Sequence, residues 1–426
     1  MRSKPLYGFF LGIDFGTSGA RSVMIDQEGI IQTEARYPFQ ISETSDLGAY
    51  WQKALFSLIE QIPRVLRAEI QAIAINGTSG TVLLCDAVGQ PVDAPLLYND
   101  ARGAVVTRRL RSIAPENHTV ISATSSLAKL LWMLQLPNSV EAKYFMHQAD
   151  WLAFLLHGQL GISDYHNALK LGYDVEELRY PDWLEKLQIQ VHLPKVITPG
   201  TPIAELSPRI AIDFGFRRDC LVCAGTTDSI AAFIASGAKL SGEAVTSLGS
   251  TLVVKLLSRT RVEDARYGIY SHRLGDKWLV GGASNTGGAV LRQFFSDAEL
   301  ERFSAEIDAS QISQLDYYPL LKAGDRFPIN DPNLPPRMEP RPENPVEFLH
   351  GLLESIARIE VRGYELLQDL GAERLTCVYT AGGGAVNSTW TAIRARRLQV
   401  PMISPVNTEA AYGTALLAMR GVSGNC

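Results

Sequence analysis

Short apolar runs separated by small-residue turns fill the beginning of the chain. Residues 9–14 and 20–25 are two such runs, and the segment 15–19 between them reads Phe-Gly-Thr-Ser-Gly. Apolar runs of this length bounded by turn residues predict strands, so we expect a β-hairpin here. The strand–turn–strand order distinguishes this segment from a P-loop, whose glycine-rich turn opens a helix.

Helical and strand-like patterns alternate in the next part of the chain. Apolar residues that recur three and four positions apart predict helices, and compact apolar runs predict strands. The helices are expected near residues 49–61, 101–114, 126–136 and 150–158, and the strands at residues 70–75 and 82–85. The last of these helices ends at a glycine, which is a typical helix cap.

A second β-rich block begins near Cys220. We expect a strand at residues 221–224, a helix at 229–238, and two strands at 244–248 and 252–257 around the turn Gly249-Ser-Thr. This turn between two apolar strands resembles the first hairpin. The repetition predicts two similarly built halves.

The final third of the chain contains a long amphipathic helix at residues 344–370. Asn344 is the expected cap, Pro345 suits the first helical position, and Gly371 marks the end. We expect a strand at 376–380 leading into Gly382-Gly-Gly384, and a last helix at 408–419. Arg394, Arg396 and Arg397 are expected on a solvated helix face.

Composition places the chain among multidomain enzymes. The 426 residues predict two or three domains, and with 46% hydrophobic residues the chain can bury a large core. The net charge of -5 argues against a nucleic-acid partner, and no apolar run is long enough to cross a membrane. The five scattered cysteines do not form a disulfide framework. We therefore expect a soluble protein of a reducing compartment, the cytoplasm.

The first hairpin turn carries the residues that an anion site needs. Backbone N–H groups at Gly16 and the hydroxyls of Thr17 and Ser18 can converge on a phosphate. Asp14, at the end of the preceding strand, can hold Mg²⁺ directly or through water. The alternative is an ordinary hairpin with common turn residues.

Asp228 ends the motif Gly225-Thr-Thr-Asp, where a strand is expected to pass into a helix. Ligands of α/β folds bind at such junctions. A carboxylate there can accept the proton of a substrate hydroxyl, its role in phosphoryl transfer. The alternative is a helix N-cap, for which Asp is a favoured residue.

Two glycine-rich turns in the second half add further candidates. Gly249, Ser250 and Thr251 form a second candidate phosphate loop. The glycines at 382–384 follow a strand and precede a helix, so a flat or phosphorylated ligand can lie against their backbone. Together with the two acids, these turns are far more specific than one glycine-rich turn alone.

The whole chain resembles the FGGY carbohydrate kinases, within the sugar kinase/actin/Hsp70 superfamily. Several segments carry the resemblance: the first hairpin turn, Asn99-Asp-Ala-Arg102, the helix 150–158, Asp164-Tyr-His-Asn-Ala168, Gly225-Thr-Thr-Asp228, Gly249-Ser-Thr251, Tyr318–Pro328, Gly382-Gly-Gly384 with Trp390, and Glu409–Ala418. Asp325 stands where the family usually has Glu.

The resemblance implies an α/β protein with two actin-like (ribonuclease H-like) ATPase domains flanking a cleft. The expected domains are residues 1–228 plus about 405–426, on the sugar and phosphate side, and residues 229–404, on the nucleotide side. The implied reaction is ATP-dependent phosphorylation of a sugar or polyol hydroxyl, with ATP and Mg²⁺ as cofactors. We expect no nucleic-acid or membrane partner, and a monomer or a homodimer.

The resemblance also implies roles for individual residues. Asp228 would be the general base and would contact the substrate, while Asp14 would help to hold Mg²⁺ and orient the phosphates. The phosphates would lie against Gly16, Thr17, Ser18, Gly249, Ser250 and Thr251, and adenosine against Gly383, Gly384 and Asn387. The sugar would contact Thr78, Ser79, Asp100 and Arg102.

The identity of the sugar depends on a departure from the family pattern. Similar xylulose kinases carry Gly-Gln-Met-His-Gly where this chain has Asn76-Gly-Thr-Ser-Gly80. Thr78 and Ser79 thus replace the sugar-contacting Met and His. The short chain resembles the cyanobacterial and plant D-ribulose/xylulose kinase-like group, so a ketopentose is favoured, D-ribulose first. The alternatives are D-xylulose, glycerol or another polyol, and a sugar-independent ATPase or ATP-binding regulator of the same superfamily.

Overall fold

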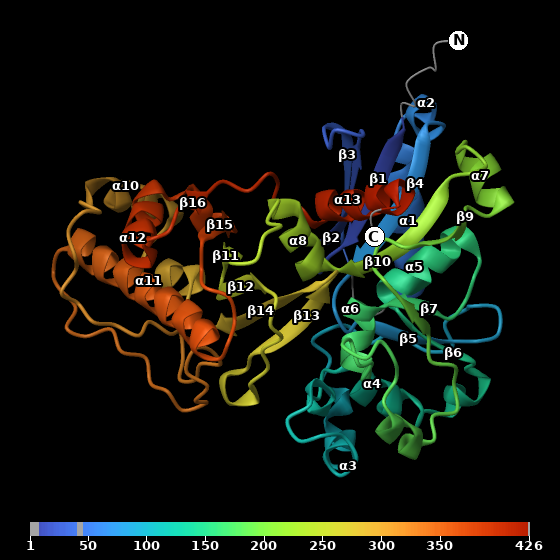
Figure 1. Ribbon diagram of the computed structural model, residues 1–426, viewed down its shortest axis with the longest axis horizontal. Helices are drawn as coiled ribbons and strands as arrows, with labels where there is room; N and C mark the ends of the chain where they lie inside the picture. Colours follow the sequence, from blue (N-terminus) through green and yellow to red (C-terminus); the bar gives the residue numbers. More distant parts are fainter. Residues whose placement is uncertain (1–7, 41–45, 425–426) are drawn as a thin grey trace. The chain divides into compact units, whose positions relative to one another are not determined.

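The computed structural model describes residues 8–40 and 46–424, which fall into two compact units (Figure 1). The first unit extends to Ala235 and takes up the chain again from Glu409, whereas the second spans Ser236–Thr408. The first unit therefore includes the helix that Asp228 begins, a helix that the sequence analysis assigned to the second domain.

A six-stranded sheet forms the centre of the first unit. Its order is β3-β2-β1-β4-β10-β9, and the strands are β1 (Phe9–Phe15), β2 (Gly19–Ile25), β3 (Ile31–Pro38), β4 (Ile70–Gly77), β9 (Pro202–Glu205) and β10 (Leu221–Thr227). Strands β1 and β2 are antiparallel, which confirms the predicted hairpin. Strands β1, β4 and β10 are parallel, so their carboxyl ends meet at one edge of the sheet.

Helices cover both faces of this sheet. Helices α1 (Leu47–Gln61) and α5 (Gln148–His157) contribute Trp51 and Trp151 to one core, and α13 (Ala410–Ser423) packs against β1 and β4 on another (Figure 1). Gly12 permits this second packing, because a Cβ there would collide with the Ala411 carbonyl oxygen. The final helix of the chain thus belongs to the first sheet.

A smaller part of the first unit has its own apolar core. It contains β5 (Val82–Cys85), β6 (Tyr144–His147) and α4 (Ser126–Met133). The continuous helix predicted at 101–114 is wrong, since a 3-10 helix at Arg102–Val106 precedes the short α3 (Thr107–Arg111). Gly103 packs closely against Ala128, and this contact fixes the path of the chain here. The local spacing of apolar residues could not indicate such a contact.

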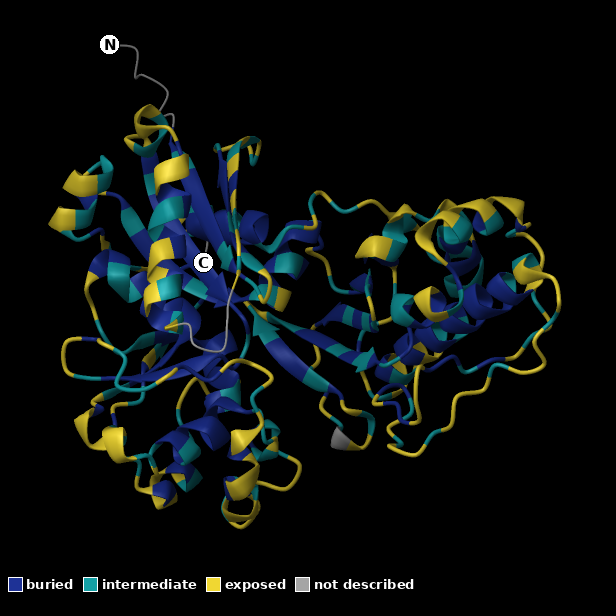
Figure 2. Ribbon diagram, turned by 180° about the vertical axis from the view of Figure 1, so that it is seen from behind, coloured by how far each residue is buried: buried dark blue, intermediate teal, exposed yellow. Residues whose placement is uncertain are grey.

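The second unit repeats the plan of the first. Its sheet order is β13-β14-β12-β11-β15-β16, with β11 (Glu243–Leu248), β12 (Leu252–Ser258), β13 (Tyr270–Leu274), β14 (Lys277–Ser284), β15 (Cys377–Ala381) and β16 (Met402–Ile403). An antiparallel hairpin, β11–β12, again lies beside a parallel neighbour, β15. The predicted similarity of the two halves is confirmed, and in both sheets most strand residues are buried (Figure 2).

The long helix α11 (Pro345–Asp369) forms as the sequence predicts. The Asn344 side chain accepts a hydrogen bond from the Val346 N–H at 3.0 Å, and Pro345 occupies the first turn. One face of α11 is buried (Figure 2). Within the described residues, neither this helix nor any other is long and apolar enough to span a bilayer.

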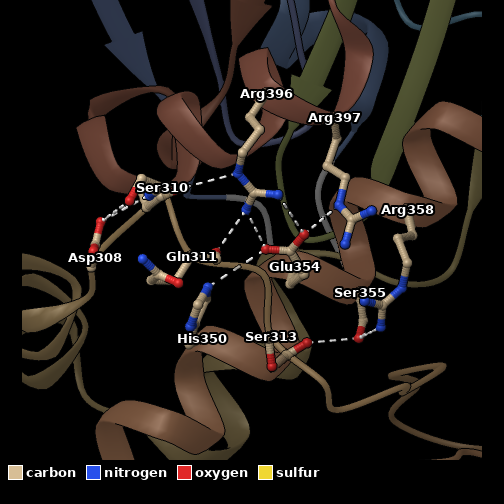
Figure 3. A network of polar contacts seen from close by, with 12 residues as sticks. Asp308, Ser310, Gln311, Ser313, His350, Glu354, Ser355, Arg358, Arg396 and Arg397 are labelled. Atoms are coloured by element: carbon tan, nitrogen blue, oxygen red, sulfur yellow. Dashed lines mark hydrogen bonds and ion pairs between the residues drawn. The ribbon is translucent and has the colours of Figure 1, made fainter.

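The expectation of a solvated arginine face on α12 (Ser388–Leu398) is wrong. Arg394 is completely buried and pairs with Glu360 of α11. Arg396 and Arg397 both reach the buried Glu354 (Figure 3). Their partners precede them in the chain by a long interval, so the local charge pattern could not indicate the pairing.

Candidate active site

Two predicted acids lie at the same edge of the first sheet. Asp14, near the end of β1, is paired in register with Asn76 of β4. Thr226, near the end of β10, also pairs with Asn76, and Asp228 directly follows that strand. The fold therefore brings Asp14 and Asp228 together from distant parts of the sequence.

Asp14 is held in surroundings that disfavour its negative charge. Burial, and next the charge of Asp228, raise its pKa from 3.8 to about 7, against the opposing influence of Arg21. Its Oδ1 is buried and has no hydrogen-bond partner among the described residues. An acid with an unpartnered oxygen beside a second acid is a position where a cation would be stabilised.

Residues at the beginning of helix α13 support the edge of the sheet at which Asp14 lies. Arg21, opposite Asp14 on β2, forms an ion pair with Glu409. The Asn76 amide donates to Thr414 Oγ1 at 2.5 Å. Side chains at the start of α13 thus hold the neighbours of Asp14 in place.

A backbone hydrogen bond closes the hairpin turn after Asp14. The Gly16 N–H donates to the Gly19 carbonyl oxygen at 3.0 Å. Thr17 and Ser18 lie exposed at the tip. This arrangement leaves their hydroxyls available to an anion on the surface of the first unit.

Asp228 is the first residue of helix α8 (Asp228–Ser236), and its Oδ1 accepts from the Ser229 N–H at 2.7 Å. The positive end of the helix favours an ionised carboxylate there. Two residues earlier, the Thr226 hydroxyl is 2.7 Å from Nδ1 of His166, on helix α6 (Tyr165–Ala168). A buried contact therefore fixes the Thr226 side chain, two residues before Asp228.

Lys170 lies beside the candidate site, and the sequence analysis did not single it out. Burial lowers its pKa, and the charge of Asp228 opposes that effect, which places the ammonium within the field of the carboxylate. A Cβ added to Gly80 would lie 3.8 Å from Lys170 Cδ, so the side chain also borders the turn after Ser79. The available signal was a lone lysine two residues after the Asp164–Ala168 motif.

Thr78 and Ser79 have different surroundings. Thr78 is buried, and its hydroxyl lies 2.5 Å from that of Thr81 and 3.4 Å from Gln148 Oε1. Ser79 is only partly buried and precedes Gly80, whose positive φ of 85° sets the turn. Of the two side chains, that of Ser79 is the more exposed.

A buried lysine connects this turn with the next candidate segment. Lys129 Nζ donates to the carbonyl oxygens of Gly80, Leu97 and Tyr98 at 2.7, 2.6 and 3.2 Å. Burial lowers its pKa to about 8. Lys129 thereby fixes the Ser79–Gly80 turn against the chain that leads to Asp100.

Asp100 and Arg102 form an ion pair with each other. Arg102 Nη2 and Nε lie 2.6 and 2.9 Å from Asp100 Oδ2, and the guanidinium stacks over Trp132 at 4.7 Å. Burial would raise the pKa of Asp100, but the hydrogen bonds from Arg102 outweigh it and hold the pKa below its usual value. The predicted pair thus exists, with Arg102 half exposed.

In the second unit, one cavity of about 700 Å³ collects most of the predicted nucleotide residues. Its walls include Gly249, Ser250, Gly383, Gly384 and Asn387, but Thr251 is not among them. The opposite wall comes from α10 (Asp297–Glu306), which the sequence analysis did not assign to the site. The volume lies within the range of small-molecule pockets, about 300–1,000 Å³.

Local contacts hold the two glycine-rich turns of this cavity. The Gly288 N–H, at the start of α9 (Gly288–Phe294), donates to the Gly249 carbonyl oxygen at 2.9 Å. Gly384 has no room for a side chain, because a Cβ would lie 2.6 Å from the Trp390 ring. The backbone of both turns can therefore approach a ligand closely.

The Asn387 side chain is already used by the fold. Its Oδ1 accepts from the Trp390 N–H at 2.9 Å and caps α12, and its Nδ2 donates to Ser304 Oγ at 2.8 Å. One N–H and one lone pair remain for another partner. Asn387 thereby joins α12 to α10 across the cavity wall.

Two family models together match almost the entire chain. The N-terminal domain of the FGGY family of carbohydrate kinases matches residues 9–235, and the C-terminal domain matches residues 244–422. The chain belongs to the FGGY family of carbohydrate kinases. The predicted family and enzyme class are confirmed: the protein is an ATP-dependent sugar kinase, a phosphotransferase.

Individual relatives are distant but similar over most of their length. The xylulose kinase of Bacillus subtilis strain 168 is 24% identical over 97% of this chain and 88% of its own. The gluconokinase of the same strain is 23% identical over 76% of this chain and 70% of its own. A xylulose kinase structure from Rhodospirillum rubrum superimposes with a TM-score of 0.84 at 19% identity, over 97% of this chain and 90% of that one. The predicted α/β fold with two actin-like domains is confirmed.

Proposed function

We propose that this FGGY kinase transfers the γ-phosphoryl group of ATP to a hydroxyl of a ketopentose, D-ribulose first. The placement of Asp228 carries the proposal: it lies at the carboxyl edge of the first sheet beside Asp14, with Lys170 nearby. A protein that only bound ATP would not need a base at this position. The rest of the mechanism follows from the charges at this edge.

Asp228 accepts the proton of the attacking hydroxyl. The bond from that oxygen to the γ-phosphorus forms as the bond from phosphorus to the leaving oxygen of ADP breaks. Phosphoryl transfer requires mainly alignment and charge stabilisation, so the carboxylate acts by orienting the hydroxyl and removing its proton late. The positive charge of Lys170 and the N-terminus of α8 favour the ionised form that this role needs.

The acids at the sheet edge suit a magnesium ion. Asp14 offers a buried oxygen without a partner, and Asp228 adds a second carboxylate. Among the described residues, no three His, Cys, Asp or Glu side chains gather as a metal site. Mg²⁺ commonly binds one or two carboxylates, waters and substrate phosphates, so Asp14 would hold it directly or through water. When bound, the ion neutralises charge on the phosphates.

Two turns are assigned to the phosphates and a third to adenosine. Gly16, Thr17 and Ser18 would bind phosphate oxygens in the first unit, as would Gly249, Ser250 and Thr251 in the second. Adenosine would lie in the cavity of the second unit against Gly383 and Gly384. Asn387 would offer its remaining N–H or lone pair and would also shape the cavity through α12.

The sugar contacts are assigned to the polar groups around Asp228. Ser79 and Lys170 would bind sugar oxygens, as would the Asp100–Arg102 pair and Thr78, whose hydroxyl also contacts Thr81. A hydroxyl and an ammonium suit the carbonyl and hydroxyls of a ketopentose. D-xylulose, the substrate that the names of several relatives indicate, is the alternative.

A substrate panel tests the proposal. ADP release would be measured with Mg-ATP and each of D-ribulose, D-xylulose, gluconate and glycerol, and without any acceptor. We expect the highest kcat/KM with D-ribulose and little release without acceptor. Preference for gluconate or glycerol would contradict the ketopentose assignment, and acceptor-independent hydrolysis without any phosphorylated sugar would favour an ATPase.

A further inference from the structure

A buried carboxylate of α11 in the second unit accepts hydrogen bonds from two other elements, α12 and β11. Glu360 of α11 is 1% exposed. Arg394 of α12 donates to it from Nε at 2.6 Å and from Nη2 at 2.7 Å. Thr246 of β11 donates its hydroxyl to Glu360 Oε1 at 2.5 Å.

The network extends to the parallel neighbour of β11. Arg394 Nη1 donates to Thr380 Oγ1 of β15 at 2.8 Å. Tyr364, one turn along α11 from Glu360, lies 2.8 Å from the Thr246 hydroxyl. Thr246 and Thr380 are register partners on the two strands. The buried ion pair is therefore hydrogen-bonded to adjacent positions of β11 and β15.

The three connected elements are those that lead into the nucleotide cavity. Strand β11 runs from Thr246 into the Gly249 turn, and β15 runs from Thr380 into the Gly383 turn. Helix α12 begins beside Asn387. All of these turns line the same cavity, so the ion pair lies directly behind the residues assigned to ATP.

We propose that the Glu360–Arg394 pair is a positioning element that sets the spacing of the Gly249 and Gly383 turns, and thereby the affinity for ATP. The inference rests on the proposed assignment of this cavity to the nucleotide. An apolar pair of similar size could hold α11 against α12 equally well. It could not donate and accept the directed hydrogen bonds that fix both strand ends.

Threonine variants separate positioning from simple packing. Thr246→Val removes the link from β11 to Glu360, and Thr380→Val removes the link from β15 to Arg394, while both leave the ion pair intact. We expect each to raise the Kd for Mg-ATP, measured by calorimetry, by about fivefold. The KM for the sugar should change less than about twofold, because the contacts lie on the nucleotide side.

The double variant Glu360→Gln/Arg394→Met removes both charges and keeps most of the volume. We expect it to fold, by circular dichroism, and to raise the Kd for Mg-ATP by about tenfold or more. Glu354→Gln is the matched control: Glu354 is also buried and pairs with Arg396 and Arg397 between α11 and α12 (Figure 3), but among the described residues it bonds to neither β11 nor β15. Its Kd for Mg-ATP should stay at the wild-type value.

The outcomes distinguish this inference from the proposed function. An unchanged Kd in folded Thr246, Thr380 and double variants would overturn the positioning role, as would an equal increase in the Glu354 control. Wild-type protein that binds Mg-ATP but turns over no ketopentose would contradict the proposed substrate, and the Kd comparison would still decide the positioning role. Wild-type protein that binds no Mg-ATP would overturn both.

Discussion

Asp14 lies near the end of β1 and Asp228 directly follows β10, the two strands that flank β4, and the charge of Asp228 helps to raise the pKa of Asp14 to about 7. Two acids that disfavour each other's negative charge therefore lie at one edge of the first sheet. We interpret this pair as a functional site whose electrostatic cost is relieved when a cation and substrates bind.

Asp14→Asn should stabilise the fold at neutral and alkaline pH while removing activity. Because the folded state raises the Asp14 pKa from 3.8 to about 7, folding favours the protonated carboxyl. The resulting loss in the free energy of unfolding is absent below pH 3.8, increases as the pH rises, and reaches its full value above about pH 7. A pKa shift of about 3 units corresponds to a destabilisation of at most about 4 kcal/mol.

Urea unfolding of wild type and Asp14→Asn between about pH 5.5 and pH 8.5 measures this difference. The gap in the free energy of unfolding should widen up to about pH 7 and then stay constant. Asp219→Asn is the control, because Asp219 is exposed and bound to Arg217. A gap that is the same at every pH would show that the folded protein does not perturb Asp14.

Lys170→Met should weaken sugar use and leave ATP binding intact. The ammonium lies near Asp228 and beside the Ser79–Gly80 turn, so its loss would remove the proposed sugar contact and a charge that favours the proposed base. We expect kcat/KM for D-ribulose to fall about 100-fold, with the Kd for Mg-ATP within about twofold of wild type. Lys186→Met, at an exposed lysine, should behave as wild type, and equal losses in both variants would refute the assignment.

Ser79→His should shift the choice between ketopentoses. The variant restores the residue that similar xylulose kinases carry, at a partly buried position next to Gly80. We expect the ratio of kcat/KM for D-xylulose over D-ribulose to rise about tenfold. Thr78→Met would instead disturb a buried hydroxyl that contacts Thr81, so it serves as the comparison for lost stability. An unchanged ratio of the two kcat/KM values in folded Ser79→His protein would mean that this position does not contribute to the choice between the sugars.

The elements that the sequence predicted correctly are those specified by neighbouring residues. The hairpin around Gly16 and the helix capped by Asn344 depend on turn chemistry and apolar spacing within a short segment. The glycine turns at 249 and 383 were predicted for the same reason, and the fold then placed them in one cavity.

The residues that the sequence did not reveal depend on partners far along the chain. Arg394 was expected in solvent, but Glu360 of another helix buries and neutralises it. Lys170 gained its place in the site only because the fold brings the Gly80 turn and Asp228 to it. The contact of the Thr78 hydroxyl with Gln148 also comes from a distant part of the chain, and the expected role of Thr78 at the sugar stays a prediction.

The role of Asp228 is the centre of the account, and Asp228→Asn tests it most directly. The variant keeps the shape of the side chain at the start of α8 and removes the basic oxygen. D-ribulose-dependent ADP release should fall by about 10³-fold or more, with the Kd for Mg-ATP close to wild type. Near wild-type release by a folded Asp228→Asn protein would contradict the assignment of the general base.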